Sequence, residues 1–480
     1  MNHVLKDRYL AKLARLGQLS FEARLKGLFD PGTCELINVL DWDAAWKQAV
    51  TTARGLVHGR PCLAYATNFL VDGGTVGATE ASTIVALLGL AARERLPVVA
   101  LLHSNGARVT ERYDAMAGNG MLFKEMTRLS GVVPQLAACM GLCLGVAAYL
   151  AALADLNWMV AEHSHAATTS PAVIRLATGQ QVKWDELGGA RMHASQSGFA
   201  HFVAQHEAAC LADIRRVLGL LGCDRPFEAP ATVAIEALVP RAPSIPYDVR
   251  TLIDAIVDHA SFQEVHKDWG QSLVCGLAQL GGRPIGVLAN QSSVRSGVLD
   301  TQSLRKASRF AQLCNAWGFA LVYLVDVPGL MVSMEEEQAG ILDAGAIFFH
   351  AVDTDVPRIA VVIRKCYGGA FVMMQARQAG GDRVYAYPNA QIGIAGPEVT
   401  FAIVHGKEHL THSEPKDFRN ASIQALRQVP TDAEAALAAG LVDRIIEPSE
   451  TRAVLIDTLA EIGPSPTRIR HPRKHPNLPV

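Results

Sequence analysis

The chain has 480 residues, of which 50% are hydrophobic and 19% are charged, and its formal net charge is −2 at pH 7. This length fits two domains with sizeable cores, and this composition excludes a disordered chain. The near-zero charge gives no electrostatic basis for binding nucleic acid.

The N-terminal segment, residues 1–17, is basic and amphipathic. It lacks the apolar centre that a secretory signal needs, so it predicts a helix at the surface. Short apolar runs follow at 61–68 and 98–102, and each leads through Gly or Asn into a segment with helical periodicity. Continuous apolar strands that alternate with helices predict an α/β fold with a covered sheet.

Residues 136–154 carry no charged side chain and are long enough to span a membrane. Their content is mostly Ala, Gly and Cys, and basic flanks are missing. A buried strand followed by a buried helix is therefore favoured over a membrane span. The nine cysteines include no Cys-x-x-Cys pair, which predicts reduced thiols in a cytoplasmic protein, with neither a disulfide framework nor a zinc ribbon.

The second half of the chain repeats the glycine and proline pattern of the first half. Residues 225–246, between the two copies, are rich in Pro and Ala and predict a linker. The sequence therefore predicts two tandem copies of one domain, 1–245 and 246–480, with an irregular extension at 464–480. The paired positions, 223 residues apart (282 − 59), are Gly59 and Gly282, Gly106 and Gly329, Pro134 and Pro357, and Gly145 and Gly368.

Each half contains a turn that leads from an apolar strand into a helix. The first is Gly145-Val146-Ala147, and the second is Gly368-Gly369-Ala370. The first turn of a helix leaves backbone N–H groups without partners, and glycine lets a ligand approach them closely. Two such amides can stabilise an enolate or an oxyanion. Glycines before a helix can also serve only the close packing of strand and helix, so both interpretations stay open.

Several segments carry a resemblance to a known family. They are Glu186–Ala190, Ser197–His201, Asp326–Gly329, Arg364–Ala370 and Ala439–Pro448. These segments resemble the carboxyltransferase (β) subunits of biotin-dependent acyl-CoA carboxylases, of the propionyl-CoA and acetyl-CoA type. The resemblance covers about residues 13–462 and implies two tandem crotonase-like domains, each a ββα superhelix, in agreement with the repeat.

The resemblance also implies a mechanism. In this family, carboxybiotin on a carrier domain and an acyl-CoA meet between the N-terminal domain of one subunit and the C-terminal domain of another. The amides of Val146 and Ala147 would hold the enolate oxygen of the thioester, and those of Gly369 and Ala370 the ureido oxygen of biotin. Further substrate contacts would come from Ser104, Asn105, Gly106, Ala107, Arg108, Gly145, Gly368, Phe371 and Val372.

The same resemblance implies partners. A biotin carboxylase and a biotin carrier subunit would supply biotin, a coenzyme A thioester would be the substrate, and the chain would form a homo-hexamer. The chain contains no biotinylation Met-Lys-Met and no ATP-binding motif. ATP-driven carboxylation would therefore need the partner subunits.

Several positions depart from the family pattern. The family usually has Asp at His103, Gly at Val146 and Asp at Val372, and the last position resembles one that tunes the size of the acyl group. The triplet Glu335–Glu337 is predicted to be a solvated acidic turn. A divergent member is expected, and two alternatives stay open: a biotin-independent decarboxylase of malonyl-type thioesters, and a structural paralogue without activity.

Three further groups allow two interpretations each. His405, His409 and His412 have a helical spacing that could bind a metal, but a surface cluster is favoured. Arg364–Lys365 could attract the carboxylate of the donor or form a basic pair at a strand end. Asp326 is predicted to cap its own turn rather than to act in catalysis.

Overall fold

The computed structural model describes residues 3–222, 229–230, 234–426 and 431–462. The chain forms two compact units that divide between Gly222 and Cys223. From the predicted linker, Ile235 and Val239 pack into the core of the second unit. The rest of that linker, 225–228 and 231–233, and the predicted extension at 464–480 lie outside the described residues.

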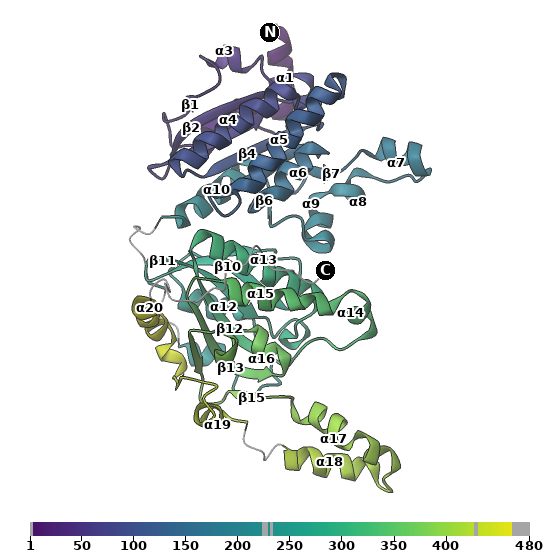
Figure 1. Ribbon diagram of the computed structural model, residues 1–480, viewed down its shortest axis with the longest axis vertical. Helices are drawn as coiled ribbons and strands as arrows, with labels where there is room; N and C mark the ends of the chain where they lie inside the picture. Colours follow the sequence, from purple (N-terminus) through teal and green to yellow (C-terminus); the bar gives the residue numbers. More distant parts are fainter. Residues whose placement is uncertain (1–2, 223–228, 231–233, 427–430, 463–480) are drawn as a thin grey trace. The chain divides into compact units, whose positions relative to one another are not determined.

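The first unit is a sheet covered by helices (Figure 1). Its described strands follow the order β1-β2-β3-β4-β5-β6-β8, with β7 paired to β5. Strands β3 to β6 are parallel, and every residue of β4 is buried, as its uninterrupted apolar run predicts. The strands are β1 (Glu35–Leu36), β2 (Val50–Val57), β3 (Arg60–Thr67), β4 (Val98–Ser104), β5 (Gln135–Leu144), β6 (Leu156–Val160), β7 (His165–Ala167) and β8 (Phe202–Ala204).

The helices of the first unit bury an apolar stripe against this sheet. Ile84 and Leu88 of α4 and Leu122 and Met126 of α5 belong to the same buried cluster as Ala100 of β4. The helices are α1 (His3–Arg15), α2 (Phe21–Leu28), α3 (Trp42–Ala45), α4 (Ala78–Glu94), α5 (Tyr113–Leu129), α6 (Val146–Leu153), α7 (Pro171–Thr178), α8 (Trp184–Gly188), α9 (Ala190–Met192) and α10 (Glu207–Leu220). The helix expected within residues 1–17 is α1.

The second unit repeats this arrangement. Its described strands follow the order β16-β14-β13-β12-β11-β10-β9, with β15 paired to β13. They are β9 (Gln263–Val265), β10 (Leu273–Leu280), β11 (Arg283–Asn290), β12 (Ala320–Val327), β13 (Arg358–Tyr367), β14 (Arg383–Ala386), β15 (Gln391–Gly393) and β16 (Arg444–Ile445).

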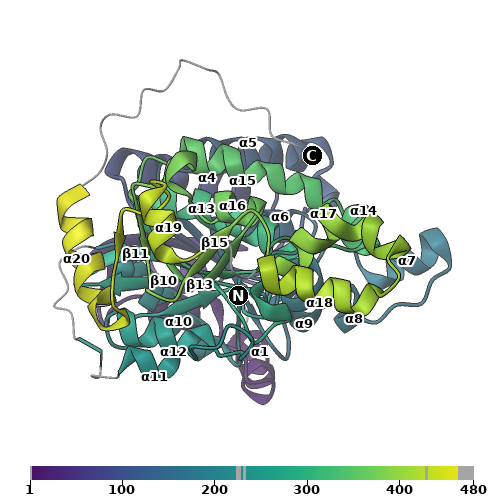
Figure 2. The same cartoon turned by 90° about the horizontal axis from the view of Figure 1, so that it is seen from below.

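The helices of the second unit include a hairpin, α17–α18, that projects from the sheet (Figure 1 and Figure 2). Helix α13 begins where Asp300 accepts a hydrogen bond from the N–H of Ser303 at 2.8 Å, a regular N-cap. The helices are α11 (Ile235–Leu238), α12 (Val249–Ile256), α13 (Thr301–Trp317), α14 (Met334–Gln338), α15 (Ala346–Asp353), α16 (Gly369–Met373), α17 (Pro397–Thr411), α18 (Pro415–Leu426), α19 (Ala433–Ala438) and α20 (Thr451–Ile462).

Equivalent elements of the two units keep the offset found in the sequence. Strand β3 begins at Arg60 and β11 at Arg283 (283 − 60 = 223), and the pairs α4 and α13, β5 and β13, and α6 and α16 follow the same offset. The predicted duplication and α/β fold are confirmed. The strand and helix expected at 136–154 are β5 and α6, and no helix of the described residues is long and apolar enough to cross a membrane.

A bulge interrupts both sheets at the same place. In β5, residues 140–142 together oppose His103 of β4. In β13, residues 363–365 together oppose Asp326 of β12. A bulge bends its strand and changes the direction of the chain that follows. In each unit the chain that follows is the glycine turn into α6 or α16.

Candidate active site

The first turn joins β5 to α6 at Gly145. This residue has φ 49° and ψ −113°, which favours glycine, and its N–H donates to the carbonyl of Ala167 in β7 at 2.9 Å. The side chain of Ala147 is fully buried in the first core. The N–H groups of Val146 and Ala147 donate to no acceptor among the described residues. The turn therefore presents two adjacent N–H groups at a helix start.

The second turn joins β13 to α16 with the same construction. Gly368 has φ 64° and ψ −147°, and its N–H donates to the carbonyl of Gly393 in β15 at 3.0 Å. Ala370 is fully buried, and within the described part of the chain the N–H groups of Gly369 and Ala370 have no acceptor. A Cβ added at Gly369 would meet no atom within 4 Å. One side of this turn is therefore open to a ligand.

Both turns reach the surface of their unit. The methyl groups of Ala147 and Ala370 lie in the interior, whereas Gly145 and Val146 are half-buried and Gly369 is exposed. The buried alanine fixes the start of each helix, and the residue before it keeps part of its surface exposed. A turn sealed inside the core could not hold a substrate oxygen, and neither turn is sealed.

The predicted CoA-binding stretch, Ser104–Arg108, lies against the first turn. The hydroxyl of Ser104 accepts from the N–H of Gly106 at 3.0 Å. Gly106 has φ 94°, and a Cβ there would lie 2.5 Å from the carbonyl oxygen of Leu144, the last residue of β5. The structure therefore brings this stretch to the carboxyl end of β5, directly before Gly145. Its contact with CoA stays a prediction.

The remaining residues of the stretch fasten it to the segment before α4. The N–H of Asn105 donates to the carbonyl of Gly73 at 3.0 Å, and Ala107 forms a β-bridge with Val76. These contacts fix the backbone of the stretch against the residues that precede α4.

The guanidinium of Arg108 is surrounded by acceptors. It donates to Glu80 Oε1 at 2.8 Å, to Glu111 Oε1 at 3.0 Å and to the carbonyl of Thr75 at 3.0 Å. Glu111 also accepts from the N–H of Ala78 at the start of α4, and this bond lowers the pKa of Glu111. Sequence reasoning did not find the two carboxylates. In this arrangement Arg108 orients the stretch Ser104–Arg108. To contact a phosphate of CoA directly, Arg108 would have to release Glu80 or Glu111.

The side chains that depart from the family pattern fit the turns without strain. Val146 is half-buried against the first core, and its φ does not lie in the positive region. In the second turn, Phe371 is half-buried and Val372 is 37% exposed. The repeat places Tyr149, 50% exposed, at the position equivalent to Val372 (372 − 149 = 223). This tyrosine is not among the site residues predicted from the sequence, although the offset of 223 residues points to it.

Asp326 and Arg364 form a buried ion pair at the bulge of β13. Asp326 Oδ2 accepts from Arg364 Nη2 at 2.7 Å and from Nε at 2.9 Å, and the two side chains are 0% and 3% exposed. Asp326 Oδ1 also accepts from the N–H of Lys365 at 3.2 Å. Asp326 is therefore a structural group, as expected, but it bonds the backbone of β13 and not that of its own turn.

The histidine cluster lies on the projecting hairpin. His405 and His409 pack on Phe401, and His412 stacks on Phe418 with 4.4 Å between ring centroids. Among the described residues no group of His, Cys, Asp and Glu could hold a metal ion.

The acidic triplet Glu335–Glu337 is not merely solvated. Glu336 accepts from the N–H of Thr301 at 2.8 Å and from its hydroxyl at 2.6 Å. It caps the start of α13, as Glu111 caps the start of α4. The prediction of a solvated turn was therefore wrong for Glu336, because sequence alone does not bring residue 336 to residue 301.

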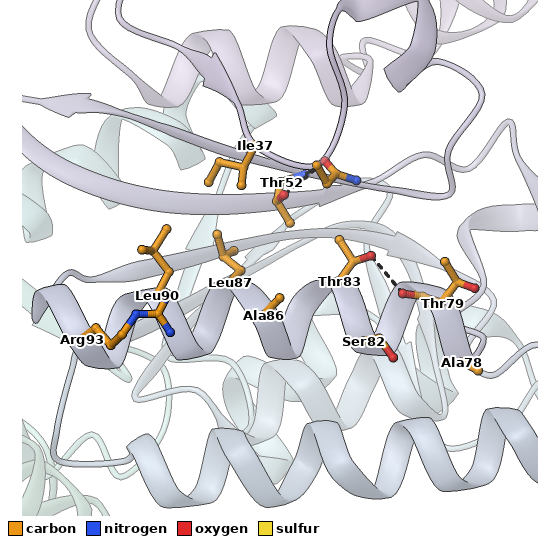
Figure 3. Close-up of a pocket in the computed structure, with 11 residues that line it drawn as sticks. Ile37, Thr52, Ala78, Thr79, Ser82, Thr83, Ala86, Leu87, Leu90 and Arg93 are labelled. Atoms are coloured by element: carbon orange, nitrogen blue, oxygen red, sulfur yellow. Dashed lines mark hydrogen bonds between the residues drawn. The ribbon is translucent and has the colours of Figure 1, made fainter.

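A groove of about 680 Å³ lies elsewhere in the first unit, between α4 and the edge formed by β1 and β2 (Figure 3). Ser82, Leu90 and Arg93 of α4 line one side, and Ile37 and Thr52 line the other. No residue of the two turns or of the stretch Ser104–Arg108 lines it. The groove is therefore separate from the candidate active site.

Comparisons with known proteins agree with this construction. The sequence matches the family described as Carboxyl transferase domain over residues 26–478. The methylmalonyl-CoA decarboxylase subunit alpha of Veillonella parvula is 37% identical over 444 residues, which cover 90% of this chain and 86% of that protein. The propionyl-CoA carboxylase carboxyltransferase subunit of Haloferax mediterranei is 36% identical over 442 residues, with 90% and 86% covered.

The fold is also found among solved structures. The transcarboxylase 12S structure, a hexamer with methylmalonyl-CoA and methylmalonic acid bound, matches with a TM-score of 0.91 at 32% identity and covers 100% of this chain and 96% of that chain. Both units have the predicted crotonase-like fold. The chain therefore belongs to the carboxyltransferase family that includes the β subunits of biotin-dependent acyl-CoA carboxylases.

Proposed function

We propose that this carboxyltransferase moves a carboxyl group between carboxybiotin, carried by a partner subunit, and the α-carbon of an acyl-CoA thioester. One observation carries the proposal: two equivalent turns each present two adjacent backbone N–H groups that have no acceptor among the described residues. Two oxygens gain negative charge in such a transfer, so one pair of donors is available for each of them.

The first turn would stabilise the thioester oxygen. The N–H groups of Val146 and Ala147 would donate to this oxygen as the α-carbon loses its proton, and the adjacent stretch Ser104–Arg108 would bind CoA. Such donors are fixed before the reaction, and the loss of one commonly lowers kcat by about 10²–10³. Most of the rate enhancement would come from these dipoles and from positioning.

The second turn would bind the biotin ring. Gly369 and Ala370 would donate to the ureido oxygen, and the open space beside Gly369 leaves room for a planar ring close to the backbone. Carboxybiotin supplies the carboxyl group and a ring nitrogen that can accept the α-proton. Because of this nitrogen, the chain needs no general base of its own.

A second candidate is net decarboxylation of a malonyl-type thioester without biotin. Two relatives named methylmalonyl-CoA decarboxylase subunit alpha, at 37% and 32% identity, favour the decarboxylation direction. This reaction would use the enolate held by Val146 and Ala147 and would not need the second turn. The equally complete construction of the second turn supports the biotin-dependent reaction instead.

The proposal includes partners and a location. A biotin carrier and a biotin carboxylase would act with this chain, and the hexameric transcarboxylase 12S supports a homo-hexamer. The cysteines of the described residues are unpaired, which is typical of a reducing compartment such as the cytoplasm.

The test is an assay of the purified chain with malonyl-CoA and methylmalonyl-CoA, with and without free biotin. We expect decarboxylation that depends on biotin and saturates with it. Decarboxylation at the same rate without biotin would overturn the proposal in favour of the second candidate. If calorimetry detects no binding of either thioester, the chain is a structural paralogue.

A further inference from the structure

A segment at the start of the second unit is held by two consecutive residues of β13. We call this segment, residues 240–247, the strap. Arg364 Nη1 donates to strap carbonyls, those of Ala242 at 3.1 Å, Ile245 at 2.7 Å and Pro240 at 3.3 Å. Lys365 Nζ donates to another, that of Pro243, at 3.2 Å. The strap therefore lies against β13 through polar contacts to its backbone.

The cation that holds the strap is itself fixed on its other sides. Asp326 accepts from Arg364 Nη2 and Nε, and the ring of Tyr247 lies 4.7 Å from the guanidinium carbon. Burial and the charge of Asp326 raise the pKa of Tyr247 well above its usual range, so its ring presents a neutral face. Burial also lowers the pKa of Lys365. The Nε, Nη1 and Nη2 atoms of Arg364 all donate to these partners and its side chain is 3% exposed, so the guanidinium is committed to the strap and to Asp326 rather than to a substrate carboxylate.

The same arginine lies in the bulge that precedes the second turn. Residues 363–365 oppose Asp326, and the turn begins only four residues after Arg364. On the far side of the bulge, Tyr367 pairs with Gly393 of β15. In the first unit the position equivalent to Arg364 is Gly141 (364 − 141 = 223), which has no side chain to hold a strap. The second turn thus has a strap that is held by a side chain of its own bulge, and the first turn has none among the described residues.

We propose that Arg364 is a positioning residue: it ties the strap to the bulge of β13 and thereby aims the N–H groups of Gly369 and Ala370. The inference rests on the proposed function, because it assigns these groups to the biotin ring. Loosening the strap changes the direction of the second turn and leaves the first turn as it is. The steps that depend on biotin should therefore weaken while the binding of acyl-CoA is unchanged.

The test compares Arg364→Lys and Arg364→Gln with a matched control on the same strand. Arg358 is also buried, 1% exposed, and donates to the carbonyl of Gly380, but it starts β13 and lies outside the bulge. The controls are Arg358→Lys and Arg358→Gln. They report what the loss of a buried arginine does to stability alone.

For Arg364→Gln we expect kcat/KM for free biotin to fall about 10- to 100-fold, because small misplacements of reacting groups have effects of this size. The dissociation constant of the acyl-CoA should stay within about twofold, and Arg364→Lys should be intermediate. The Arg358 variants should melt earlier with unchanged biotin kinetics. If Arg364→Gln does not fold, Arg364→Lys carries the comparison.

Hydrogen exchange separates this inference from the proposed function. In Arg364→Lys the hydrogen-bonded amides of the strap (Ile245, Tyr247) and of the turn (Gly368, Phe371) should exchange faster together, and in Arg358→Lys they should not. Faster exchange in the strap alone, or unchanged biotin kinetics in a folded Arg364 variant, would overturn the inference. A third outcome is possible: the variants show the expected exchange pattern, but the wild-type protein has no biotin-dependent turnover. This outcome would overturn the proposed function and leave the structural role of Arg364 in holding the strap intact.

Discussion

The two bulges occupy equivalent places and are filled in different ways. In the second sheet, the carboxylate of Asp326 and the guanidinium of Arg364 fill the space. In the first sheet, the same positions are His103 (326 − 103 = 223) and Gly141. The ring of His103 stacks on Phe69, with 4.1 Å between ring centroids, and a Cβ on Gly141 would lie 2.6 Å from it. The imidazole thus takes the room that a side chain at 141 would need.

The buried charges at the two bulges also come from different parts of the chain. His103 is 8% exposed, and burial together with the charge of Arg24 holds its pKa well below the usual range, so the ring is neutral. The cation of the first unit is Arg24, which donates to the carbonyl of Met140 within the bulge at 2.8 Å and pairs with Glu207 at 2.7 Å. Both bulges are therefore filled and have a buried cation beside them, but different residues supply these groups in the two units.

The largest effect should come from removing one donor of a turn. Gly369→Pro deletes the N–H at the first helical position, where proline is well tolerated, and we expect kcat to fall by about 10²–10³. Gly369→Ala keeps the N–H, and its methyl group meets open space, so it should retain nearly full activity. Biotin-dependent decarboxylation measures both variants, with circular dichroism as the check on folding. A Gly369→Pro variant as active as Gly369→Ala would contradict the role of the second turn.

The next largest effect should come from breaking the ion pair of the second bulge, compared with removing the neutral ring of the first. Asp326→Asn leaves the buried charge of Arg364 without its counter-ion and should lower the free energy of unfolding by about 3–5 kcal/mol. His103→Asn removes part of a neutral ring and should cost about 1–2 kcal/mol. Urea unfolding measures both. Equal losses at the two positions would show that the charge difference between the bulges has no energetic consequence.

A third prediction concerns the fit of His103 to Gly141. Gly141→Ala places a methyl group against the imidazole and should lower the free energy of unfolding by about 1–3 kcal/mol through overpacking. The double variant His103→Ala/Gly141→Ala should lose less than the sum of the single variants, because the ring is no longer in the way. Additive losses in urea unfolding would mean that the two residues do not share this space.

The neutral ring of His103 predicts that the stability of the protein depends on pH. The folded state disfavours protonated His103, whereas an unfolded histidine takes up a proton near pH 6.5. The contribution of His103 to the free energy of unfolding is therefore fully present above about pH 6.5. Below that pH it decreases by at most about 1.4 kcal/mol per pH unit. His103→Phe keeps an aromatic ring and should lose this component. Unfolding free energies of both chains at pH 7.5 and 5.5 test it, and parallel changes would contradict it.

The smallest effect concerns the carboxylates that cap α4 and α13. Glu336→Gln removes the charge beside the N-terminus of α13 and should lower the free energy of unfolding by about 0.5–1 kcal/mol. Glu111→Gln should have a larger effect, since Glu111 also binds Arg108. Thermal melts of the two variants give the comparison. A larger loss for Glu336→Gln would mean that the contact with Arg108 adds nothing.

Much of the fold could be predicted because it depends on local pattern. The uninterrupted apolar run at 98–102 belongs to a strand buried on both sides, and the glycines 145 and 368 have the positive φ that a tight turn requires. The constant offset of 223 residues between the two copies predicted the positions of both turns. The boundary between the units was harder to place, because the composition of the Pro-rich segment is typical of a linker although its Ile235 and Val239 pack into the second core.

The sequence by itself determined that the chain contains a duplicated α/β domain with one glycine turn in each copy, because apolar periodicity and backbone freedom are properties of neighbouring residues. Only the tertiary structure decided how the turns are supported. Arg364 meets Pro240 and Asp326, and Glu336 meets Thr301, across 35 to 124 residues of chain. Buried charges must find partners wherever the fold brings them, and spacing along the chain does not record that choice.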